Sequence, residues 1–513
     1  MGNQDGYFLG KTAKTKKNTL EKLQKKRKKD LEKLQKSEKK TWKNGKCVIK
    51  YGKRRDIMLK RKVYDEIVEW DKNADNKVLL IDGPRQVGKS YIIRAFGKKH
   101  YPNYIEINML SSLEAQTLFK EIKSVDDFML KLSLLTSVPI EEGKTFIFLD
   151  EIQMIKENDM ITFSKFMATQ TKYRFVLSGS LLGVELQNVQ SWPTGYMKII
   201  KMHPLDFEEF MWAFNTNEQI INHLRTSFQE LTPVDSFIHE KIMDLFRLYL
   251  IIGGMPQVVV TYLETKNMQK VNETINDINM LYKKDISQYS DSNKLFIEEI
   301  YDLIPSELNS KNKRFILKNL NENFRFRKYE QSFIWLAKAG VTIPVYNVDK
   351  PVIPLLISKK RTLFKLFHID CGMLINMSMD PSIQIKILAK EKAINFGAYY
   401  ENVVAKELYA HGFERLYFWN SKTQGEVDFL IENEGEIIPI EVKSGKDYER
   451  HNALSNLLGN PQFAIKKAYV FQNENVMVKE NRLYYPIYMI TFLKKSSKLP
   501  FETIDFDFSS IQN

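Results

Sequence analysis

Short apolar runs alternate with helical patterns from about residue 63 to residue 210. The runs that read as strands are KVLLID (77–82), YIEIN (104–108), TFIFLD (145–150), RFVLS (174–178) and MKIIKM (197–202). Strands that recur between helices indicate a parallel sheet with crossover helices. Residues 63–234 are therefore predicted to form an α/β domain built on a parallel sheet.

The pattern becomes helical after residue 235. Residues 235–292 are interrupted by IIGGMPQ (251–257) and are expected to form a helical lid. Residues 293–385 carry helical patterns at 295–304, 313–324 and 328–340. Two apolar extended runs follow, VTIPVYNV (341–348) and VIPLLISKK (352–360), separated by a turn. Helices followed by a β-hairpin are the layout of a winged-helix domain.

An α/β pattern returns in residues 386–513. A helix is expected at FGAYYENVVAKELYAHG (396–412), and strands at RLYFWN (415–420), EVDFLIE (426–432) and EIIPIEVK (436–443). The fold class predicted for the whole chain is therefore α/β and multidomain.

Charge is distributed unevenly along the 513 residues, whose formal net charge is +14. Residues 11–62 contain 23 Lys and Arg against five Asp and Glu, so the remainder is close to neutral. LEKLQK occurs at 20–25 and again at 31–36, an eleven-residue period that would place its leucines on one narrow helical stripe. Residues 1–62 are read as a basic helical or disordered extension. A solvated helix, a phosphate-binding tail and a membrane-surface helix remain open for it.

Membrane insertion and disulfides are not expected. No apolar run approaches the roughly 18 residues that span a bilayer, and the N-terminus lacks the apolar core of a signal peptide. Only Cys47 and Cys371 are present. These features favour a soluble cytoplasmic protein.

The segment IDGPRQVGKS (81–90) fits the P-loop pattern between a strand and a helix. Its glycines let backbone N–H groups surround phosphate oxygens at a helix N-terminus. We expect Lys89 to reach the β- and γ-phosphates and Ser90 to ligate Mg²⁺. The nucleotide-binding residues predicted from this segment are Gly83, Pro84, Arg85, Gln86, Val87, Gly88, Lys89 and Ser90.

Two adjacent acids at the end of TFIFLDEIQ complete a hydrolytic site. Asp150 is expected to hold Mg²⁺ and Glu151 to orient and deprotonate the attacking water. Since no guanine-specific Asn-Lys-x-Asp motif occurs, ATP is favoured over GTP. Ser178 or Ser180, after the next strand, is expected to sense the γ-phosphate.

A second group of charged residues lies near the C-terminus. Asp428 interrupts the apolar strand VDFLI, and Glu441 and Lys443 lie two residues apart in IEVK, so they face the same side. If the strands pair, Asp428 and Glu441 could bind a divalent metal, with Lys443 near the attacking water and Glu401 completing the site from the preceding helix. The alternative is a salt-bridged strand face, which spacing alone favours.

Taken together, these residues resemble a prokaryotic, largely uncharacterised group of AAA-superfamily P-loop ATPases. That group ends in a winged helix and a PD-(D/E)XK nuclease-like domain. The stretches that carry the resemblance are IDGPRQVGKS, FIFLDEIQ, FVLSGSLLG, HPLDFEEFM, YLIIGGMPQVV, WLAKAGVTIPVY, FKLFHIDCGML, GAYYENVVAKEL and GEVDFLIENEGEIIPIEVKSG.

The resemblance implies a P-loop ATPase in residues 63–234, a lid in 235–292, a winged helix in 293–385 and a restriction-endonuclease-like domain in 386–513. It also implies catalytic roles for Glu151, Glu401, Asp428, Glu441 and Lys443. The chain departs from the family at Gly195-Tyr196, where Gly-Arg is usual, and at DCGML around Cys371. The first departure puts any role of that arginine in doubt, and the second reads as a packing change.

Three functions follow as hypotheses. The first is an ATP-gated, Mg²⁺-dependent DNA nuclease, in defence or mobile-element biology. The second is an ATP-switched DNA-binding regulator whose nuclease-like fold is not catalytic, and the third is an ATP-driven remodeller. ATP and Mg²⁺ are the expected cofactors, DNA is favoured over RNA as the partner, and a homo-oligomer stays open. No arginine finger is evident in the sequence, so a hexameric ring is not assumed.

Overall fold

A computed structural model describes residues 58–73, 76–120, 122–155, 160–170, 172–180, 195–289, 294–310, 313–315, 326–391, 396–421, 423–445 and 451–496. Leu59–Asn513 form one compact unit. Residues 1–57 of the predicted basic extension, which include both LEKLQK repeats, lie outside the described residues.

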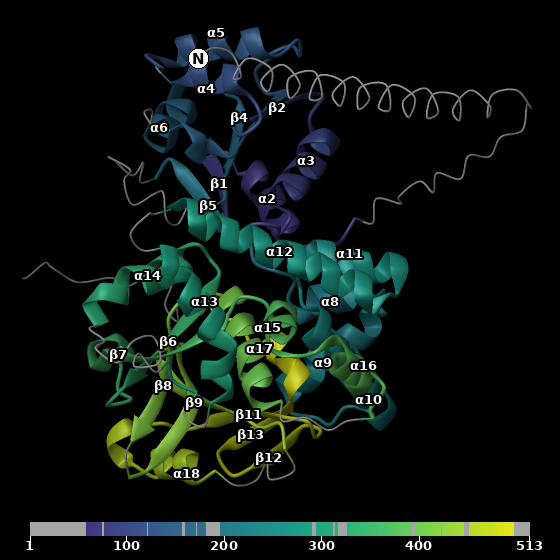
Figure 1. Ribbon diagram of the computed structural model, residues 1–513, viewed down its shortest axis with the longest axis vertical. Helices are drawn as coiled ribbons and strands as arrows, with labels where there is room; N and C mark the ends of the chain where they lie inside the picture. The colour runs from purple at the N-terminus through teal and green to yellow at the C-terminus, as the bar shows by residue number, and fades with distance from the viewer. Residues whose placement is uncertain are drawn as a thin grey trace, which may run out of the picture. The chain divides into compact units, whose positions relative to one another are not determined.

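The first sheet is parallel and has the strand order β2-β3-β4-β1-β5 (Figure 1). Its strands are β1 (Val78–Asp82), β2 (Asn103–Asn108), β3 (Thr145–Asp150), β4 (Arg174–Ser178) and β5 (Met197–Lys201). All five coincide with the predicted runs, which confirms the parallel α/β prediction. Central strands β1 and β3 are apolar at nearly every position because they are covered on both faces.

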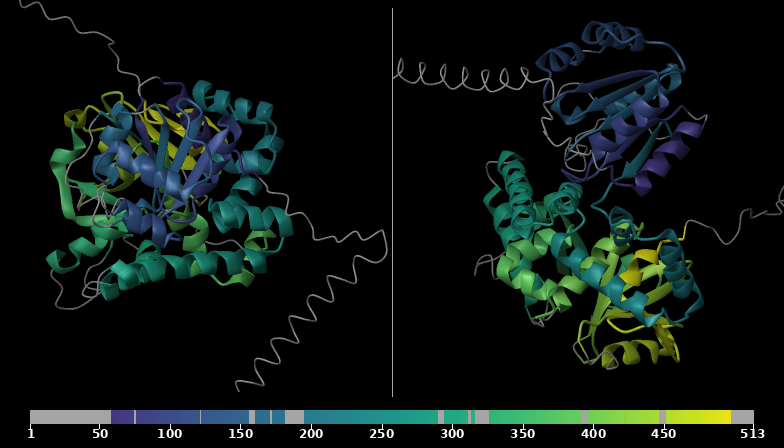
Figure 2. Two further views of the ribbon diagram at one scale, coloured as in Figure 1. Left: turned by 90° about the horizontal axis from the view of Figure 1, so that it is seen from above. Right: turned by 90° about the vertical axis from the view of Figure 1, so that its right-hand side faces the viewer.

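Helices cover both faces of this sheet (Figure 2). On one face lie α2 (Lys62–Lys72) and α3 (Lys89–His100), where Phe96 packs 5.8 Å from the ring of Phe146 in β3. The opposite face is covered by α4 (Leu113–Phe119), α5 (Val125–Leu135) and α6 (Met160–Gln170). Its core contains Leu80, Ile147 and Leu149 of the strands, packed with Phe128 and other buried residues.

In the described residues between 202 and 338, helices follow the sheet and no further strand occurs. They are α8 (Phe207–Ala213), α9 (Glu218–Glu230), α10 (Ser236–Ile252), α11 (Pro256–Thr265), α12 (Met268–Tyr289), α13 (Lys294–Asn309) and α14 (Phe326–Lys338). Asp206 and Glu209 form a capping box that starts α8. The predicted GG interruption separates α10 from α11. A Cβ on Gly254 would lie 2.2 Å from the Leu205 carbonyl oxygen, so this close approach requires glycine.

The second sheet is mixed and has the order β12-β13-β11-β10-β9-β8-β6-β7. Its strands are β6 (Thr342–Val348), β7 (Lys359–His368), β8 (Leu416–Ser421), β9 (Gly425–Asn433), β10 (Glu436–Val442), β11 (Ala468–Gln472), β12 (Met477–Lys479) and β13 (Arg482–Pro486). Helices α15 (Cys371–Ser378), α16 (Pro381–Leu388), α17 (Gly397–Ala410) and α18 (Asn452–Leu458) accompany it. Short 3₁₀ turns lie at Ile152–Met154, Leu355–Ser358, Pro461–Phe463 and Ile487–Phe492.

The predicted winged-helix hairpin differs from the structure in two respects. Its second strand is not VIPLLISKK: Leu355–Ser358 form a 3₁₀ turn, and β7 begins only at Lys359. Pro351 and Pro354 lack the N–H that a strand ladder needs, whereas Phe364, Leu366 and Phe367 supply the buried positions of the real strand. The hairpin also does not stand apart, because β6 pairs in parallel with β8 and so belongs to the C-terminal sheet.

The helix predicted at 313–324 also differs where it can be compared. Lys313, Arg314 and Phe315 are not helical, and residues 316–325 lie outside the described part. Within the described ranges no single helix is long and apolar enough to cross a membrane. Only α10 and α11 together pass that test of length and composition, and they are bent by 117°.

Candidate functional sites

The P-loop connects the carboxyl end of β1 to the first turn of α3. A Cβ on Gly83 would lie 2.2 Å from the Met202 carbonyl oxygen, so the start of the loop passes too close to the segment after β5 for any larger residue. Gly88, at φ +92°, precedes α3 in a left-handed conformation that favours glycine. The backbone is thus shaped by two glycines that the sequence pattern singled out.

Lys89 points back into the loop. Its Nζ donates hydrogen bonds to the carbonyl oxygens of Gly83 (2.6 Å) and Pro84 (2.9 Å). Burial lowers the pKa of Lys89 to about 8, although Glu151, Asp82 and Asp150 favour the charged form. A buried cation held only by carbonyl dipoles and nearby acids is well suited to receive phosphate oxygens.

Asp150 lies at the end of β3 and accepts hydrogen bonds from neutral groups. Ser90 Oγ donates to its Oδ2 at 2.8 Å, and Asn108 Nδ2, at the end of β2, donates to the same oxygen at 3.2 Å. The hydroxyl of Ser178, at the end of β4, donates to Oδ1. Ser90 and Asp150 are therefore adjacent oxygen donors beside the P-loop, which fits the ligand preference of Mg²⁺.

Glu151 is the first residue after β3 and has a left-handed backbone (φ +55°). Its Oε2 accepts hydrogen bonds from Gln153 Nε2 (2.6 Å), Ser180 Oγ (2.8 Å) and the Ser180 N–H (3.1 Å). Burial raises the pKa of Glu151, but these bonds and the charge of Lys89 outweigh burial and hold the pKa below its usual value. Glu151 is thus an ionised carboxylate whose side chain is held in one orientation by Gln153 and Ser180.

The outer side of the P-loop contacts the helical region and the start of β6. Arg85 Nη1 pairs with Asp285 of α12 at 2.8 Å, and the Tyr282 hydroxyl donates to the Arg85 carbonyl at 3.1 Å. Burial raises the pKa of Asp285 to about 6, with Arg85 acting against it. A Cβ on Gly340, in the turn between α14 and β6, would lie 3.1 Å from Pro84. Two later segments of the chain therefore touch the nucleotide-binding loop.

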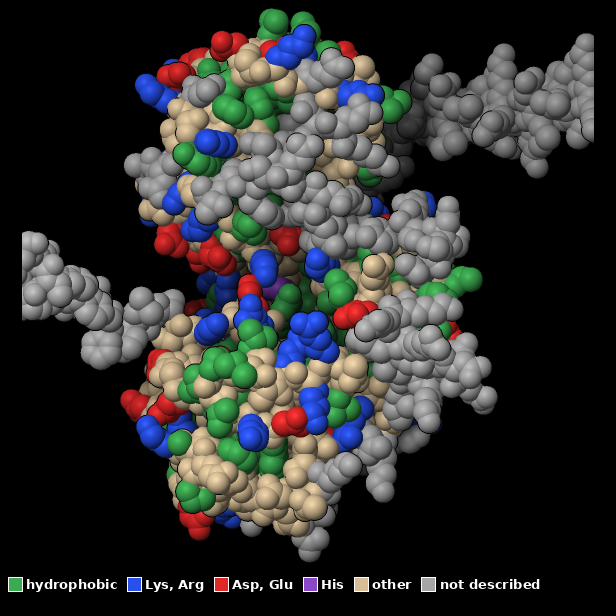
Figure 3. Space-filling model, turned by 90° about the vertical axis from the view of Figure 1, so that its left-hand side faces the viewer, with side chains coloured by type: hydrophobic (Ala, Val, Ile, Leu, Met, Phe, Trp, Pro, Cys, Tyr) green, Lys and Arg blue, Asp and Glu red, His purple; other side chains and the backbone are tan. Residues whose placement is uncertain are grey.

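A cavity of about 410 Å³ lies beside the same loop. It is lined by Asp82, Gly83, Pro84, Lys201, His203, Ala337, Lys338, Ala339, Gly340, Thr342, Pro344, Ile369, Tyr409 and Glu414. Figure 3 shows basic and acidic side chains around a hollow on the face that carries α14. The cavity extends the contacts between the P-loop and the α14–β6 turn.

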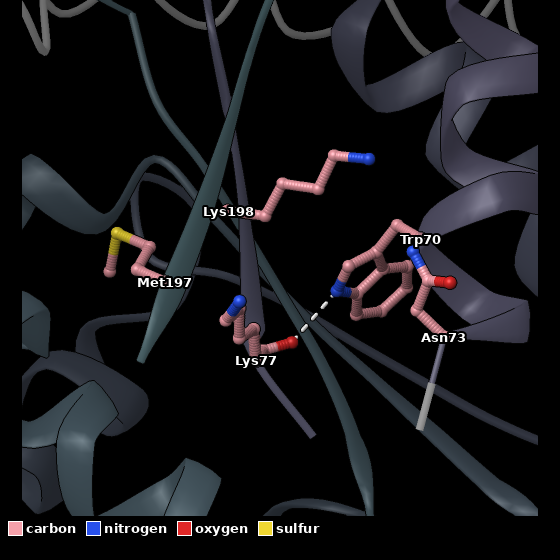
Figure 4. Close-up of a pocket in the computed structure, with 5 residues that line it drawn as sticks. All are labelled: Trp70, Asn73, Lys77, Met197 and Lys198. Atoms are coloured by element: carbon pink, nitrogen blue, oxygen red, sulfur yellow. Dashed lines mark hydrogen bonds between the residues drawn. The ribbon is translucent and has the colours of Figure 1, made fainter. Parts of the chain in front are cut away.

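A smaller pocket of about 190 Å³ lies at the opposite end of β1 (Figure 4). It is lined by Trp70, Asn73, Lys77, Met197 and Lys198, and Trp70 Nε1 donates to the Lys77 carbonyl at 2.8 Å. Because the P-loop follows the carboxyl end of β1, this pocket is separate from the nucleotide site.

The C-terminal sheet brings the predicted acidic residues together. The last antiparallel pair of β9 and β10 is Phe429 with Ile440; Asp428 directly precedes Phe429 and Glu441 directly follows Ile440, so the two acids lie next to each other at this end of the ladder. The Val442 N–H donates to Asp428 Oδ2 at 2.9 Å, and Lys443 pairs with Glu441 at 2.9 Å. Burial, then the charge of Asp428, raises the pKa of Glu441 to about 8. Glu441 Oε2 is buried without a hydrogen-bond partner.

Lysines occupy the centre of this cluster. Lys365 of β7 is fully buried and lies 3.3 Å from Glu401 Oε2, 2.8 Å from Glu426 Oε1 and 3.6 Å from Asp428 Oδ1. Lys313 pairs with Glu401 Oε1. The structure thus brings Glu401 and Asp428 close to Glu441, as predicted for a metal site, but it also places lysine ammonium groups against Glu401 and near Asp428.

Sequence reasoning missed Lys365, Lys313 and Glu426. Lys365 gave a usable signal, because it interrupts the apolar run LFKLFHI as Asp428 interrupts VDFLI, and a lone buried charge needs a partner. Lys313 lies in an irregular segment and gave none. The side chains of Arg327 and Lys328, which a winged helix would offer to DNA, lie outside the described residues.

Family comparisons agree with the first site. Residues 75–211 match the family described as AAA domain, residues 243–383 match a domain of unknown function (DUF8612), and residues 396–490 match a domain of unknown function (DUF4143). The chain therefore carries an AAA-type P-loop ATPase domain followed by two domains without an assigned function. Comparison with characterised protein sequences gives no significant match.

Several solved structures match the chain in part. The Walker-type ATPase PABY2304 of Pyrococcus abyssi is 14% identical, with coverage of 63% of this chain and 97% of that chain and a TM-score of 0.39. The RuvB Holliday junction branch migration motor of Thermotoga maritima is 13% identical, with coverage of 55% and 89% and a TM-score of 0.27. The Aeropyrum pernix Orc1 protein in complex with DNA is 12% identical, with coverage of 64% and 91% and a TM-score of 0.23. Likeness at this level does not extend to function.

Proposed function

We propose that this protein hydrolyses ATP and uses the nucleotide to switch its C-terminal region, without cleaving nucleic acid. The observation that carries the ATPase proposal is the convergence of Lys89, Ser90, Asp150 and Glu151 at the carboxyl edge of a parallel sheet inside an AAA domain. Ser90 and Asp150 are the residues that would hold Mg²⁺, which neutralises phosphate charge when bound.

Lys89 and Glu151 have different roles in the proposed hydrolysis. Lys89 exchanges the carbonyl oxygens of Gly83 and Pro84 for phosphate oxygens, which are stronger acceptors for an ammonium group. Glu151 is ionised and accepts a proton from water once it rotates away from Gln153 and Ser180. Hydrolysis would therefore depend on breaking the hydrogen bonds that Gln153 and Ser180 donate to Glu151.

The contacts of Arg85 and Pro84 connect the P-loop to the parts of the chain that we propose respond to the nucleotide. Asp285 and Tyr282 on α12 hold Arg85 from outside, and the turn at Gly340 packs against Pro84. A change in the P-loop on nucleotide binding would therefore move groups that belong to α12 and to the start of β6. Because β6 is part of the C-terminal sheet, this path links nucleotide state to that sheet.

Substitutions at Lys89 and Glu151 test the ATPase proposal. Lys89→Ala removes the charge that faces the phosphates, so ATP binding measured with a fluorescent analogue should fall by at least about tenfold. Glu151→Gln should keep binding while reducing turnover by roughly 10²–10⁴-fold, because the proposed base is lost. Lys98→Ala, in an exposed position on the same helix, is the control. Wild-type turnover in Glu151→Gln would refute the role of this residue.

For the C-terminal region we prefer nucleic-acid binding without cleavage. Neutralisation of Glu401 by Lys365 and Lys313 argues against cleavage, and the 20 basic residues of 11–57 offer phosphate contacts for binding. DNA cleavage is the second candidate, favoured by the unpartnered Glu441 Oε2 next to Lys443.

The full chain should be incubated with DNA and with RNA, with and without ATP, in Mg²⁺ and then in Mn²⁺. We expect binding whose salt dependence weakens when residues 1–57 are deleted, and no cleavage. Cleavage that Lys443→Ala abolishes would instead establish the nuclease.

A further inference from the structure

A buried group of three side chains lies away from both sites described above. Asp206 caps the N-terminus of α8, whereas Glu407 and His411 lie one turn apart at the end of α17. His411 Nε2 is 3.0 Å from Asp206 Oδ2 and 3.8 Å from Glu407 Oε2. Among the described residues, these are the three whose possible ligand atoms all lie within 4.8 Å of one another. Each side chain is at most 5% exposed.

The hydrogen bonds of His411 require more protons than a neutral imidazole carries. Its Nδ1 lies 3.1 Å from the Leu493 carbonyl oxygen, which can only accept. Its Nε2 faces the Asp206 carboxylate, which also accepts. A neutral ring has one N–H, so its other nitrogen would point a lone pair at an oxygen. Either an imidazolium or a cation between the side chains satisfies this geometry.

Glu407 supplies an independent observation. Its Oε1 accepts hydrogen bonds from the Tyr249 hydroxyl (2.8 Å), the Phe207 N–H (3.1 Å) and Lys406 Nζ (3.2 Å). Its Oε2 is buried and has no hydrogen-bond partner. An unpartnered carboxylate oxygen in a fully buried side chain is unfavourable, and it faces His411. A metal ligated by Oε2 would remove that cost.

The neighbouring cations all keep other partners. Lys62 contacts Asp206 Oδ2 at 2.5 Å but also Glu208 at 2.6 Å, and Lys406 donates to the Leu205 carbonyl and the Tyr249 hydroxyl. None of them reaches Glu407 Oε2 within hydrogen-bonding distance. These lysines therefore neutralise the surrounding acids without filling the space between His411 and Glu407.

We propose that Asp206, Glu407 and His411 bind one divalent transition-metal ion of the zinc class. One imidazole nitrogen and two carboxylate oxygens match zinc chemistry, whereas Mg²⁺ prefers oxygen ligands and bound water. The Leu493 carbonyl accepts the Nδ1 proton of His411, the usual support of a metal-ligating histidine, and leaves Nε2 free to ligate. The ion fastens the segment that follows the ATPase sheet to α17 of the C-terminal region.

The test uses the full chain, freed of affinity tags and treated with chelator. Zinc is added in the presence of excess Mg²⁺, so that Mg²⁺ occupies the nucleotide site, and bound zinc is measured by elemental analysis after dialysis. We expect a full equivalent of zinc, a higher melting temperature, and, with Co²⁺, the absorption of a low-symmetry nitrogen and oxygen site. Binding should be lost in His411→Gln and in Glu407→Gln, which place neutral groups of similar size.

Two controls separate this site from others on the chain. His223→Gln changes an exposed histidine on α9, and Glu441→Gln changes the C-terminal acidic cluster. Both should bind zinc as the wild type does. The proposal is overturned if the wild type binds no zinc, if His411→Gln binds it unchanged, or if Glu441→Gln abolishes binding. An imidazolium that only pairs with Asp206 would give the first of these results, and this measurement does not depend on any variant folding.

Discussion

Lys365→Met would remove the cation at the centre of the C-terminal acidic cluster while keeping most of the volume of the side chain. Lys365 contacts Glu401, Glu426 and Asp428 at 2.8–3.6 Å and is fully buried. At an effective dielectric of about 20, a charge pair at roughly 3 Å is worth about 5 kcal/mol before desolvation is subtracted. Burying the lysine offsets much of that attraction.

Removal of one partner leaves the carboxylates uncompensated, so the variant should lose about 3–5 kcal/mol in free energy of unfolding. Glu401 keeps Lys313, and Asp428 keeps the Val442 N–H, so the cluster is not left wholly without donors. Urea denaturation in metal-free buffer can be followed by tryptophan fluorescence, to which the buried Trp419 on β8, in the sheet that contains the cluster, contributes with the other five tryptophans.

Lys360→Met is the matched control, because it makes the same substitution on the same strand. Lys360 forms a pair with Asp349 in which both side chains are about half exposed, so the change should cost at most about 1 kcal/mol. Adding Mn²⁺ should restore part of the stability of Lys365→Met, about 2.7 kcal/mol at a hundredfold excess over Kd. If Lys365→Met is no less stable than Lys360→Met, the lysine does not neutralise the cluster and the argument against a metal site there fails.

Three further predictions concern groups with shifted pKa values or specific tethers. Glu441→Gln should flatten the pH dependence of the melting temperature. In the folded wild type the pKa of Glu441 is about 8, above the ordinary 4.5, so the wild type loses stability as the pH rises from 4.5 to about 8. The loss is at most about 1.4 kcal/mol per pH unit. Asp285→Asn breaks the pair with Arg85 and should raise KM for ATP roughly fivefold; since the pKa of Asp285 is about 6, the wild-type pH–rate profile should carry an inflection there that the variant lacks. Gln153→Ala frees one tether of Glu151, so basal ATP turnover should rise about fivefold in a phosphate-release assay, and a fall would mean that Gln153 instead positions Glu151 for reaction.

Local patterns predicted the first sheet and the location of its site. The strands of the ATPase domain are continuous apolar runs, and a buried parallel strand needs no partner information to be recognised. The P-loop and the Asp150-Glu151 pair are each contiguous in sequence, and the carboxyl ends of parallel strands meet at one edge. These features are therefore visible without knowledge of distant contacts.

Features that depend on distant contacts were not predicted. The second strand of the hairpin begins later than predicted, because the apolar run at 352–358 contains Pro354 and follows Pro351, and the true strand begins with basic residues, most of them exposed. Lys313 and Glu401 are separated by 88 residues, and Lys365 and Glu401 by 36. No spacing rule connects such pairs, and only the sheet that joins β7 to β6, β8 and β9 brings Lys365 to Asp428.

The kind of donor that holds a buried carboxylate separates the two acidic sites. Asp150 is held by Ser90, Ser178 and Asn108, which are neutral and leave its negative charge in place. A divalent cation can therefore enter at the cost of rearranged hydrogen bonds only. Both oxygens of Glu401 are held by ammonium groups, Oε1 by Lys313 and Oε2 by Lys365, so a metal there would have to displace a cation, whereas Glu407 Oε2 at the proposed zinc site has no cation to displace. This difference is the physical reason for proposing Mg²⁺ with ATP at the first site only, and hence an ATPase that binds nucleic acid without cutting it.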